Sequence, residues 1–121
     1  MSKTITITAD NFESTVRSNE MVLLDFWASW CGPCRFFAPI FEKAAEEHPG
    51  IAFGKIDTES QRELASAFAI TSIPTLVAIK SQTVVFSQPG ALPAAALDEL
   101  IEQLQQLDLE LVRSTAGGTA A

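Results

Sequence analysis

Two thiols are the side chains of this sequence best suited to chemistry, because Cys31 and Cys34 stand close together in Trp30-Cys31-Gly32-Pro33-Cys34. Thiols at this spacing can exchange with a disulfide, form a structural bridge, or provide two ligands of a metal site. Zinc usually takes four ligands, and a structural bridge is unusual in a reducing cytosol. The spacing and its context therefore favour thiol-disulfide exchange, with two structural cysteines and half of a metal site as the alternatives.

The cysteine pair follows a predicted strand and opens a predicted helix. Met21–Trp27 is an almost continuous apolar run interrupted by Asp25, a pattern typical of a strand buried on both faces. From Pro33 to about His48, apolar residues recur every three or four positions, which indicates one face of an amphipathic helix. Pro39 lies inside that pattern, and we expect it to bend the helix rather than divide it.

The start of that helix is a favourable place for a thiolate. Unpaired N–H groups and the positive end of the helix dipole are expected to lower the pKa of Cys31, the more exposed sulfur and the predicted nucleophile. Cys34 lies in the first helical turn, where it can attack a mixed disulfide formed by Cys31, so we predict that it is the resolving thiol. Gly32 leaves room for a substrate chain, and Pro33 suits a helix start. His48 lies at the far end of the helix and is assigned no role.

The remaining sequence predicts an α/β domain. Further strands are predicted at Thr4–Thr8, Ile51–Ile56, Thr75–Ile79 and Thr83–Phe86, and further helices at about Asp10–Arg17, at Gln61–Phe68 and from Pro93 through Leu107 and Leu111. The alternation implies parallel central strands, and the last two strands would add an antiparallel hairpin at the edge, giving a mixed sheet with helices on both faces. The loop of that hairpin, Lys80-Ser81-Gln82-Thr83, lacks the Asn-Gly turn common at such positions.

Length and charge limit the possible functions. The 121 residues suffice for one domain, which we expect to span residues 1–112, with residues 113–121 as a disordered tail. A net charge of −7, with lysines and arginines scattered singly, argues against partners that need a basic surface, so neither nucleic acid nor membrane is expected to bind. The start has no signal-peptide pattern, and no apolar run approaches the roughly 18 residues that span a bilayer, so a cytoplasmic location is expected.

Beyond the cysteine pair, the chain resembles the thioredoxin family over residues 3 to about 107. The resemblance rests on separated motifs in the family's order, namely Asp25-Phe26-Trp27-Ala28-Ser29-Trp30-Cys31-Gly32-Pro33-Cys34, Ala38-Pro39, Lys55-Ile56-Asp57, Ile73-Pro74-Thr75 and Gly90-Ala91. It implies the thioredoxin fold, with a central mixed sheet of about five strands flanked on both faces by about four helices. It also implies a protein-disulfide reductase, an electron carrier that cycles between a dithiol and a Cys31–Cys34 disulfide.

The resemblance assigns roles to residues outside the cysteine pair. Asp25 matches a buried carboxylate beneath the second cysteine, which accepts the proton of that thiol through water, and burial would raise its pKa. Lys55 matches a lysine near this aspartate that modulates its proton affinity. Pro74 matches a cis-proline facing the sulfurs, where a cis bond after Ile73 would present backbone groups for strand-like pairing with a substrate.

The resemblance also implies the partners. Trp30, Ile73, Gly90 and Ala91 would form an apolar rim on which disulfide-containing client proteins dock, with Trp27 packed beneath it. Electrons would come from an external NADPH-dependent flavoprotein, thioredoxin reductase; no bound cofactor and no metal are expected, and the protein is expected to be a monomer. Departures in the loops that flank the motifs leave a redox-independent docking subunit of a partner protein as the alternative function. An oxidant or isomerase role is disfavoured by the missing export signal.

Overall fold

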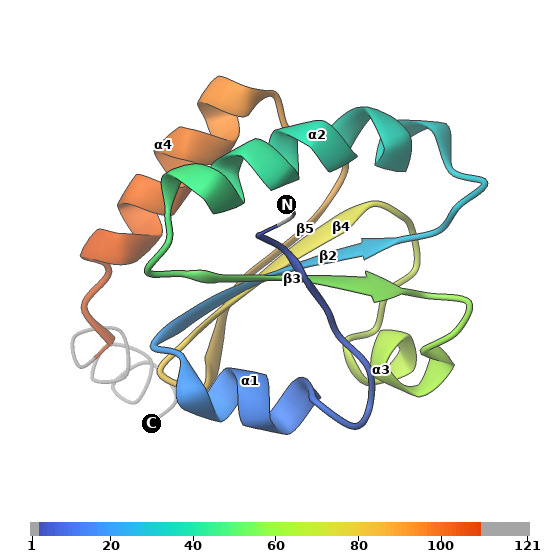
Figure 1. Ribbon diagram of the computed structural model, residues 1–121, viewed down its shortest axis with the longest axis horizontal. Helices are drawn as coiled ribbons and strands as arrows, with labels where there is room; N and C mark the ends of the chain where they lie inside the picture. Colours follow the sequence, from blue (N-terminus) through green and yellow to red (C-terminus); the bar gives the residue numbers. More distant parts are fainter. Residues whose placement is uncertain (1–2, 110–121) are drawn as a thin grey trace, which may run out of the picture.

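The computed structural model of the chain describes residues 3–109, which form alternating strands and helices (Figure 1). In chain order the elements are β1 (Ile5–Thr6), α1 (Phe12–Ser18), β2 (Met21–Trp27), α2 (Gly32–Glu47), β3 (Ala52–Asp57), α3 (Arg62–Ala67), β4 (Thr75–Lys80), β5 (Thr83–Pro89) and α4 (Ala94–Gln106). Within this part of the chain, no helix has the length and apolar character needed to cross a bilayer. The order of these strands and helices along the chain is the order that the sequence predicted.

The strands of the described residues form one five-stranded mixed sheet in the order β1-β3-β2-β4-β5. β1, β3 and β2 are parallel, whereas β4 runs antiparallel to both β2 and β5. The sequence placed antiparallel pairing in the final hairpin alone, and this detail was wrong. α3 and its flanking loops return the chain to the end of the sheet that it has just left, so Thr75 at the start of β4 pairs with Phe26 near the end of β2. No crossover to the far end occurs, and β4 must run backwards.

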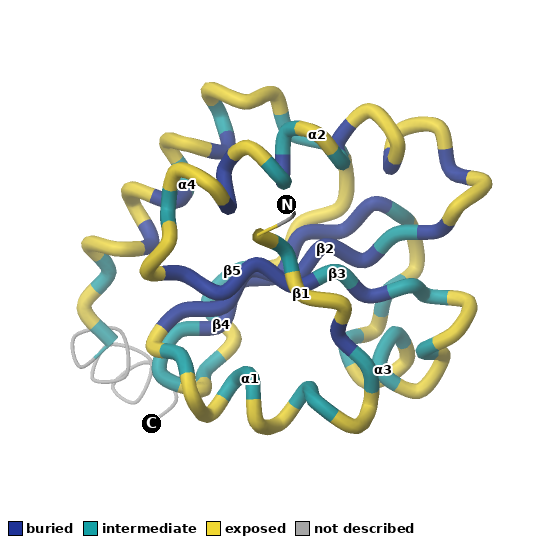
Figure 2. Tube along the Cα trace, viewed as in Figure 1, coloured by how far each residue is buried: buried dark blue, intermediate teal, exposed yellow. Residues whose placement is uncertain are grey.

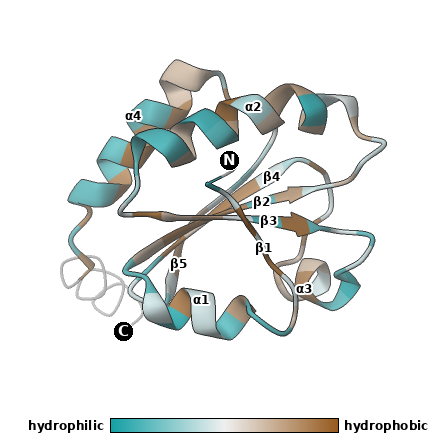
Figure 3. Ribbon diagram, viewed as in Figure 1, coloured by the Kyte–Doolittle hydropathy of each residue, from teal (hydrophilic) through white to brown (hydrophobic). Residues whose placement is uncertain are grey.

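Helices cover both faces of the sheet, with α2 and α4 on one face and α1 and α3 on the other (Figure 1). The three inner strands, β3, β2 and β4, are buried along most of their length (Figure 2). The strands carry much of the hydrophobic surface, while hydrophilic residues lie on the helices (Figure 3). The core under α2 and α4 includes Leu23, Phe37, Phe41, Leu97 and Ile101. The core under α1 and α3 includes Val22, Leu24, Phe26, Ile56 and Val77. Alternate residues of β2 thus face opposite helical layers, as the pleat of a strand requires.

The edge of the sheet is closely packed at Gly54 of β3. Its register partner is Ile5 of β1. A Cβ atom built on Gly54 would lie 2.5 Å from Ile7 Cγ1 and 3.1 Å from Leu24 Cδ2. The space that a side chain would need is therefore already filled by Ile7, so glycine is required here for packing.

The two long helices begin within one residue of their predicted starts, α2 at Gly32 and α4 at Ala94. Pro39 lies inside α2, which continues to Glu47, so the expectation of a single helix is confirmed. α4 ends earlier than its leucine spacing suggests, because Leu107 adopts an extended conformation. At that end, Lys80 Nζ donates to the carbonyl oxygens of Leu104, Gln105 and Leu107 at 2.8, 2.9 and 2.9 Å. Leu111 and the tail predicted at residues 113–121 lie outside the described residues.

The β4–β5 hairpin turns through two residues. Lys80 pairs with Thr83, and Ser81 and Gln82 between them have φ angles of 48° and 63°. Positive φ at both positions is the requirement of the tight turn that Asn-Gly usually supplies. Ser81 is held by Glu20, whose carbonyl oxygen accepts from Ser81 N–H at 2.8 Å and whose carboxylate accepts from the hydroxyl at 2.6 Å. Tertiary contacts thus maintain the turn without the usual residues.

Candidate active site

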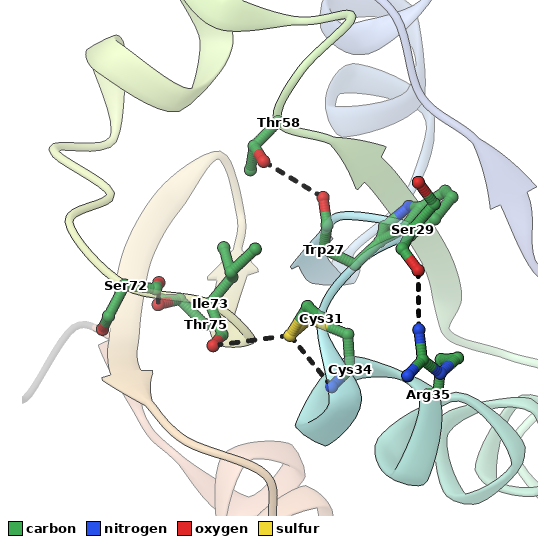
Figure 4. The surroundings of a disulfide bond; sticks show 9 residues. All are labelled: Trp27, Ser29, Cys31, Cys34, Arg35, Thr58, Ser72, Ile73 and Thr75. Atoms are coloured by element: carbon green, nitrogen blue, oxygen red, sulfur yellow. Dashed lines mark hydrogen bonds between the residues drawn. A yellow bond between two sulfur atoms is a disulfide. The ribbon is translucent and has the colours of Figure 1, made fainter.

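The cysteine pair lies at the junction of β2 and α2 (Figure 4). Cys31 is the N-cap residue of α2, and its Sγ accepts a hydrogen bond from the N–H of Cys34 at 3.1 Å. The two residues form a disulfide, with Cα atoms 5.2 Å apart. No group of three or more His, Cys, Asp or Glu side chains suited to a metal ion occurs among residues 3–109. The sulfur of Cys31 therefore occupies the place where a helix start stabilises negative charge.

Both cysteines are buried. Cys31 is 4% exposed and Cys34 3%, so whole-residue exposure hardly distinguishes the residue expected to be the more exposed from its partner. Ala28 completes a small buried cluster with them, against which Trp27 and Ile73 pack. What distinguishes the two sulfurs is position, because Cys31 precedes the helix and Cys34 lies inside its first turn.

Hydrogen bonds that the sequence did not reveal hold the loops around the pair (Figure 4). Arg35 Nη1 donates to the carbonyl oxygen of Ser29 at 2.9 Å, which ties the loop before α2 to the helix itself. Thr75 Oγ1 donates to the carbonyl oxygen of Ser72 at 2.6 Å. The only sequence signals were a basic residue directly after the second cysteine and a threonine directly after a proline, and both are weak.

A second loop meets the sulfurs from the side of β4. The Ile73–Pro74 peptide bond is cis, as expected. The carbonyl oxygen of Ile73 lies 3.7 Å from Cys31 Sγ, so residues 42 positions apart in sequence are adjacent here. Gly90 N–H donates to the carbonyl oxygen of Pro74 at 2.7 Å, which brings the segment after β5 to the same place. Gly90 has a φ of 106°, a conformation that favours glycine.

The residues predicted to form the apolar rim differ in exposure. Trp30 is 64% exposed, whereas Ile73 is half-buried against the cysteine cluster. Ala91 packs against the core under α2 and α4. Next to Cys31 in sequence, a Cβ atom on the exposed Gly32 would meet nothing within 4 Å, so the start of α2 is open at this residue. His48 caps the opposite end of α2, away from the cysteines.

Asp25 is the buried carboxylate of the site. It is 1% exposed, and neither of its carboxyl oxygens has a hydrogen-bond partner among residues 3–109. Burial raises its pKa from 3.8 to about 7, although the nearby positive charge of Lys55 acts in the opposite direction. Asp25 follows Leu23 by two positions in β2, so it faces the same helical layer, the one that contains Cys34.

Lys55 lies next to Asp25 in the sheet, because the two residues are register partners on β3 and β2. Its Nζ lies 5.1 Å from the centroid of the Trp27 ring. A cavity of about 100 Å³ lies between Lys55, Trp27 and Cys34, with Ala38 of α2 also in its wall. The structure therefore places a carboxyl group with a pKa near neutrality on the α2 side of the sheet, beside a lysine that shares a cavity with the second cysteine.

Comparison with known protein families matches residues 3–103 to the family described as Thioredoxin. The chain belongs to the thioredoxin family. A Streptomyces coelicolor protein assigned as thioredoxin 2 is 57% identical over 113 residues, which are 93% of this chain and 84% of that protein. The thioredoxin of Haemophilus influenzae is 40% identical and covers 85% of this chain and 98% of its own length.

Solved structures give the same assignment. A mutant thioredoxin of Halobacterium salinarum is 32% identical and superposes with a TM-score of 0.81, covering 88% of this chain and 96% of that one. The thioredoxin of Plasmodium falciparum is 35% identical, with a TM-score of 0.76 and coverage of 82% and 97%. The expected thioredoxin fold, a mixed sheet flanked by helices on both faces, is thereby confirmed.

Family membership and the disulfide together define the activity. Thioredoxins are protein-disulfide oxidoreductases that use a redox-active cysteine pair and need no bound cofactor. They exchange electrons with a reductase and with disulfide-containing client proteins. The chain is therefore a thiol-disulfide oxidoreductase of the thioredoxin type, and its redox-active pair is Cys31 and Cys34.

Proposed function

We propose that this thioredoxin works as a reductase of protein disulfides, with Cys31 as the nucleophile. The observation that carries this proposal is the position of Cys31 Sγ at the start of α2, where it accepts the N–H of Cys34 at 3.1 Å. In the reduced protein the same N–H and the helix dipole would stabilise a thiolate on Cys31. That thiolate attacks one sulfur of a client disulfide, forms a mixed disulfide with it, and displaces the other client sulfur as a thiolate.

Cys34 then completes the exchange. Its thiol loses a proton to Asp25, and the resulting thiolate attacks Cys31 Sγ in the mixed disulfide. The Cys31–Cys34 disulfide forms, the client leaves with both of its sulfurs reduced, and two electrons have passed from this protein to the client. A pKa of about 7 suits Asp25 to this transfer, because at neutral pH the carboxylate is present and still basic enough to take a proton. Lys55 and the cavity beside Cys34 support a route for that proton through water.

The client docks on the surface around the sulfurs. Trp30 is exposed next to Cys31, Ile73 packs against the cysteine cluster, and Gly90 is hydrogen-bonded to Pro74, while Ala91 packs against the core. We infer that these four residues form the docking rim. The backbone at Ile73 and Pro74 is offered to an extended client segment, which can pair with it in the manner of a strand. Pro33 fixes the start of α2 and so the geometry of the pair.

The electrons that regenerate the dithiol come from an external NADPH-dependent flavoprotein, thioredoxin reductase. Continuous reduction of clients requires a compartment in which the dithiol form is maintained, so we place the protein in the cytoplasm. One chain supplies both cysteines, the proton acceptor and the residues of the docking surface. The protein accordingly acts as a monomer.

Reduction of insulin, followed as turbidity in the presence of NADPH and thioredoxin reductase, tests the direction of the reaction. The wild-type protein is expected to be active and Cys31→Ser inactive. Cys34→Ser is expected to accumulate a mixed disulfide with insulin, visible by mass spectrometry, because resolution needs the second thiol. Activity retained by Cys31→Ser would refute the assignment of the nucleophile. Genetic complementation by the double Cys31→Ser, Cys34→Ser variant would favour a redox-independent docking role instead.

The proton-acceptor role of Asp25 is tested by the rate of resolution. Asp25→Ala is expected to form the mixed disulfide normally and to release the client more slowly, with the largest deficit near neutral pH. Stopped-flow measurement of client release from pH 6 to 8 gives the profile. A release rate equal to that of the wild type across this range would exclude Asp25 from the proton transfer.

A further inference from the structure

A groove of about 610 Å³ leads away from the disulfide along α3. Trp30 forms one of its sides, and Ile73 lines it as well. Trp30 directly precedes Cys31 and the carbonyl oxygen of Ile73 lies 3.7 Å from Cys31 Sγ, so two of the residues that line the groove adjoin the disulfide. Figure 4 shows Thr58, another lining residue, on the side of this space opposite Ser72 and Ile73. A client chain held at Cys31 therefore has this groove beside it.

The lining of the groove is neutral except at one residue. Thr58, Ser66 and Thr71 contribute hydroxyl groups, and Ile70 contributes apolar surface. Arg62, at the first position of α3, is the one charged side chain among the described residues that line the groove. Within residues 3–109 its guanidinium has neither an ion pair nor a hydrogen bond. The five N–H donors of this group are therefore available to a ligand.

The charge surrounding the groove has the opposite sign. The chain has a net charge of −7, and Glu59 and Glu63 are neighbours of Arg62 in sequence, although neither lines the groove. The overall field therefore repels acidic clients and attracts basic ones. Any preference for an acidic client must accordingly come from a local contact, and among the described residues that line the groove Arg62 is the cation placed to make it.

We propose that Arg62 selects client disulfides that have an acidic side chain close to the attacked cysteine. The proposal rests on the reductase function proposed above and concerns its substrate class. An extended chain advances about 3.3 Å per residue, so positions two to four residues from the attacked cysteine lie about 7 to 13 Å from it, and a client chain that follows the groove passes Arg62 with residues of this range. There a client carboxylate can accept two parallel N–H bonds from the guanidinium, a geometry that fits carboxylate and that an ammonium cannot provide.

Rates of mixed-disulfide formation with symmetric peptides test this selection. Each probe is two identical short peptides joined by one disulfide, so both sulfurs have the same neighbours. Glu, Gln or Lys is placed at each position from two to four residues on either side of the cysteine. Full-length protein carrying Cys34→Ser attacks the probe and releases one peptide thiol, and mass spectrometry gives the second-order rate. Each rate is divided by that of dithiothreitol with the same peptide, which removes the intrinsic reactivity of the disulfide.

We expect the Glu peptide to react about threefold faster than the Gln peptide at one or more positions, the size of a partly exposed ion pair. Arg62→Gln should abolish this ratio, and Arg62→Glu should reverse it in favour of the Lys peptide. Lys43→Gln is the matched control, because it removes an exposed positive charge from α2 on the other face of the sheet and should keep the ratio. High salt should reduce the ratio in the wild-type background.

The outcomes separate this inference from the function on which it rests. Adducts that form equally fast with Glu and Gln peptides at every position would overturn the role of Arg62 and leave the reductase function intact. An unchanged Glu preference in Arg62→Gln, or a Lys preference with Arg62 present, would also overturn it. Failure of every peptide to form an adduct would overturn the proposed nucleophile together with this inference.

Discussion

Replacing Asp25 by asparagine is expected to remove a large pH dependence from the stability of the disulfide form. Asp25 is 1% exposed and lacks a hydrogen-bond partner among the described residues, so the folded protein disfavours its ionised form. Asparagine has nearly the same shape and does not ionise. Its amide is also poorly satisfied at this position, and that penalty does not vary with pH.

The sign and size of the effect follow from the two pKa values of Asp25. The pKa is about 7 in the folded protein and 3.8 is the ordinary value expected when the chain unfolds. Between these values the folded protein holds a proton that the unfolded chain has lost, so the free energy of unfolding falls as pH rises, and the loss is complete above pH 7. A difference of about three pKa units, at about 1.4 kcal/mol each, gives a loss of about 4 kcal/mol.

Urea unfolding of the oxidised protein, followed by tryptophan fluorescence at several pH values from 4 to 8, measures this effect. The difference in unfolding free energy between Asp25→Asn and the wild type should move by about 4 kcal/mol in favour of the variant over this range. Subtracting the wild type removes the titration of other carboxylates. Asp98→Asn, which changes an exposed aspartate on α4, should follow the wild-type curve. A difference that changes by less than about 1 kcal/mol would refute the raised pKa of Asp25.

Two further substitutions test packing and helix capping, both by urea unfolding. Gly54→Ala is expected to destabilise the protein by about 2 kcal/mol, because the new Cβ would lie 2.5 Å from Ile7 Cγ1. Adding Ile7→Ala should recover part of this loss, and strictly additive effects would contradict the proposed clash. Lys80→Met is expected to cost about 2 kcal/mol, since three carbonyl oxygens at the end of α4 lose a charged donor. Lys43→Met, at an exposed position of α2, should change stability by less than about 0.5 kcal/mol, and an equal loss in both variants would argue against the cap.

Local pattern was sufficient to predict the elements and the chemistry of the cysteine pair. The apolar run of β2 and the helical spacing of α2 are properties of adjacent residues, so the junction that holds Cys31 and Cys34 is visible without any long-range contact. The motifs containing Asp25 and Pro74 could be recognised by resemblance to the thioredoxin family. That the Ile73–Pro74 loop lies beside Cys31 follows from the tertiary structure and is not visible in the local sequence.

The direction of β4 depended on tertiary structure, because alternation of strands and helices does not reveal at which end of the sheet a short connection returns. The partners of Lys80 and Arg35 are backbone carbonyl oxygens, which leave no trace in the sequence. Burial of Asp25 likewise depends on the layer that covers it, and that burial sets its pKa.

The cysteine spacing by itself left a structural bridge and a metal site as alternatives, and the sequence determined thiol-disulfide exchange as the favoured chemistry through the strand and helix predicted on either side of the pair. The tertiary structure decided what surrounds that pair. It brings the Ile73 carbonyl oxygen to the sulfur, buries a carboxylate on the α2 side of the sheet, and forms a groove in which an arginine of α3 is the one charged residue among the described lining residues. These contacts join segments far apart in the chain, and they form because each strand and helix must bury its apolar face against another element.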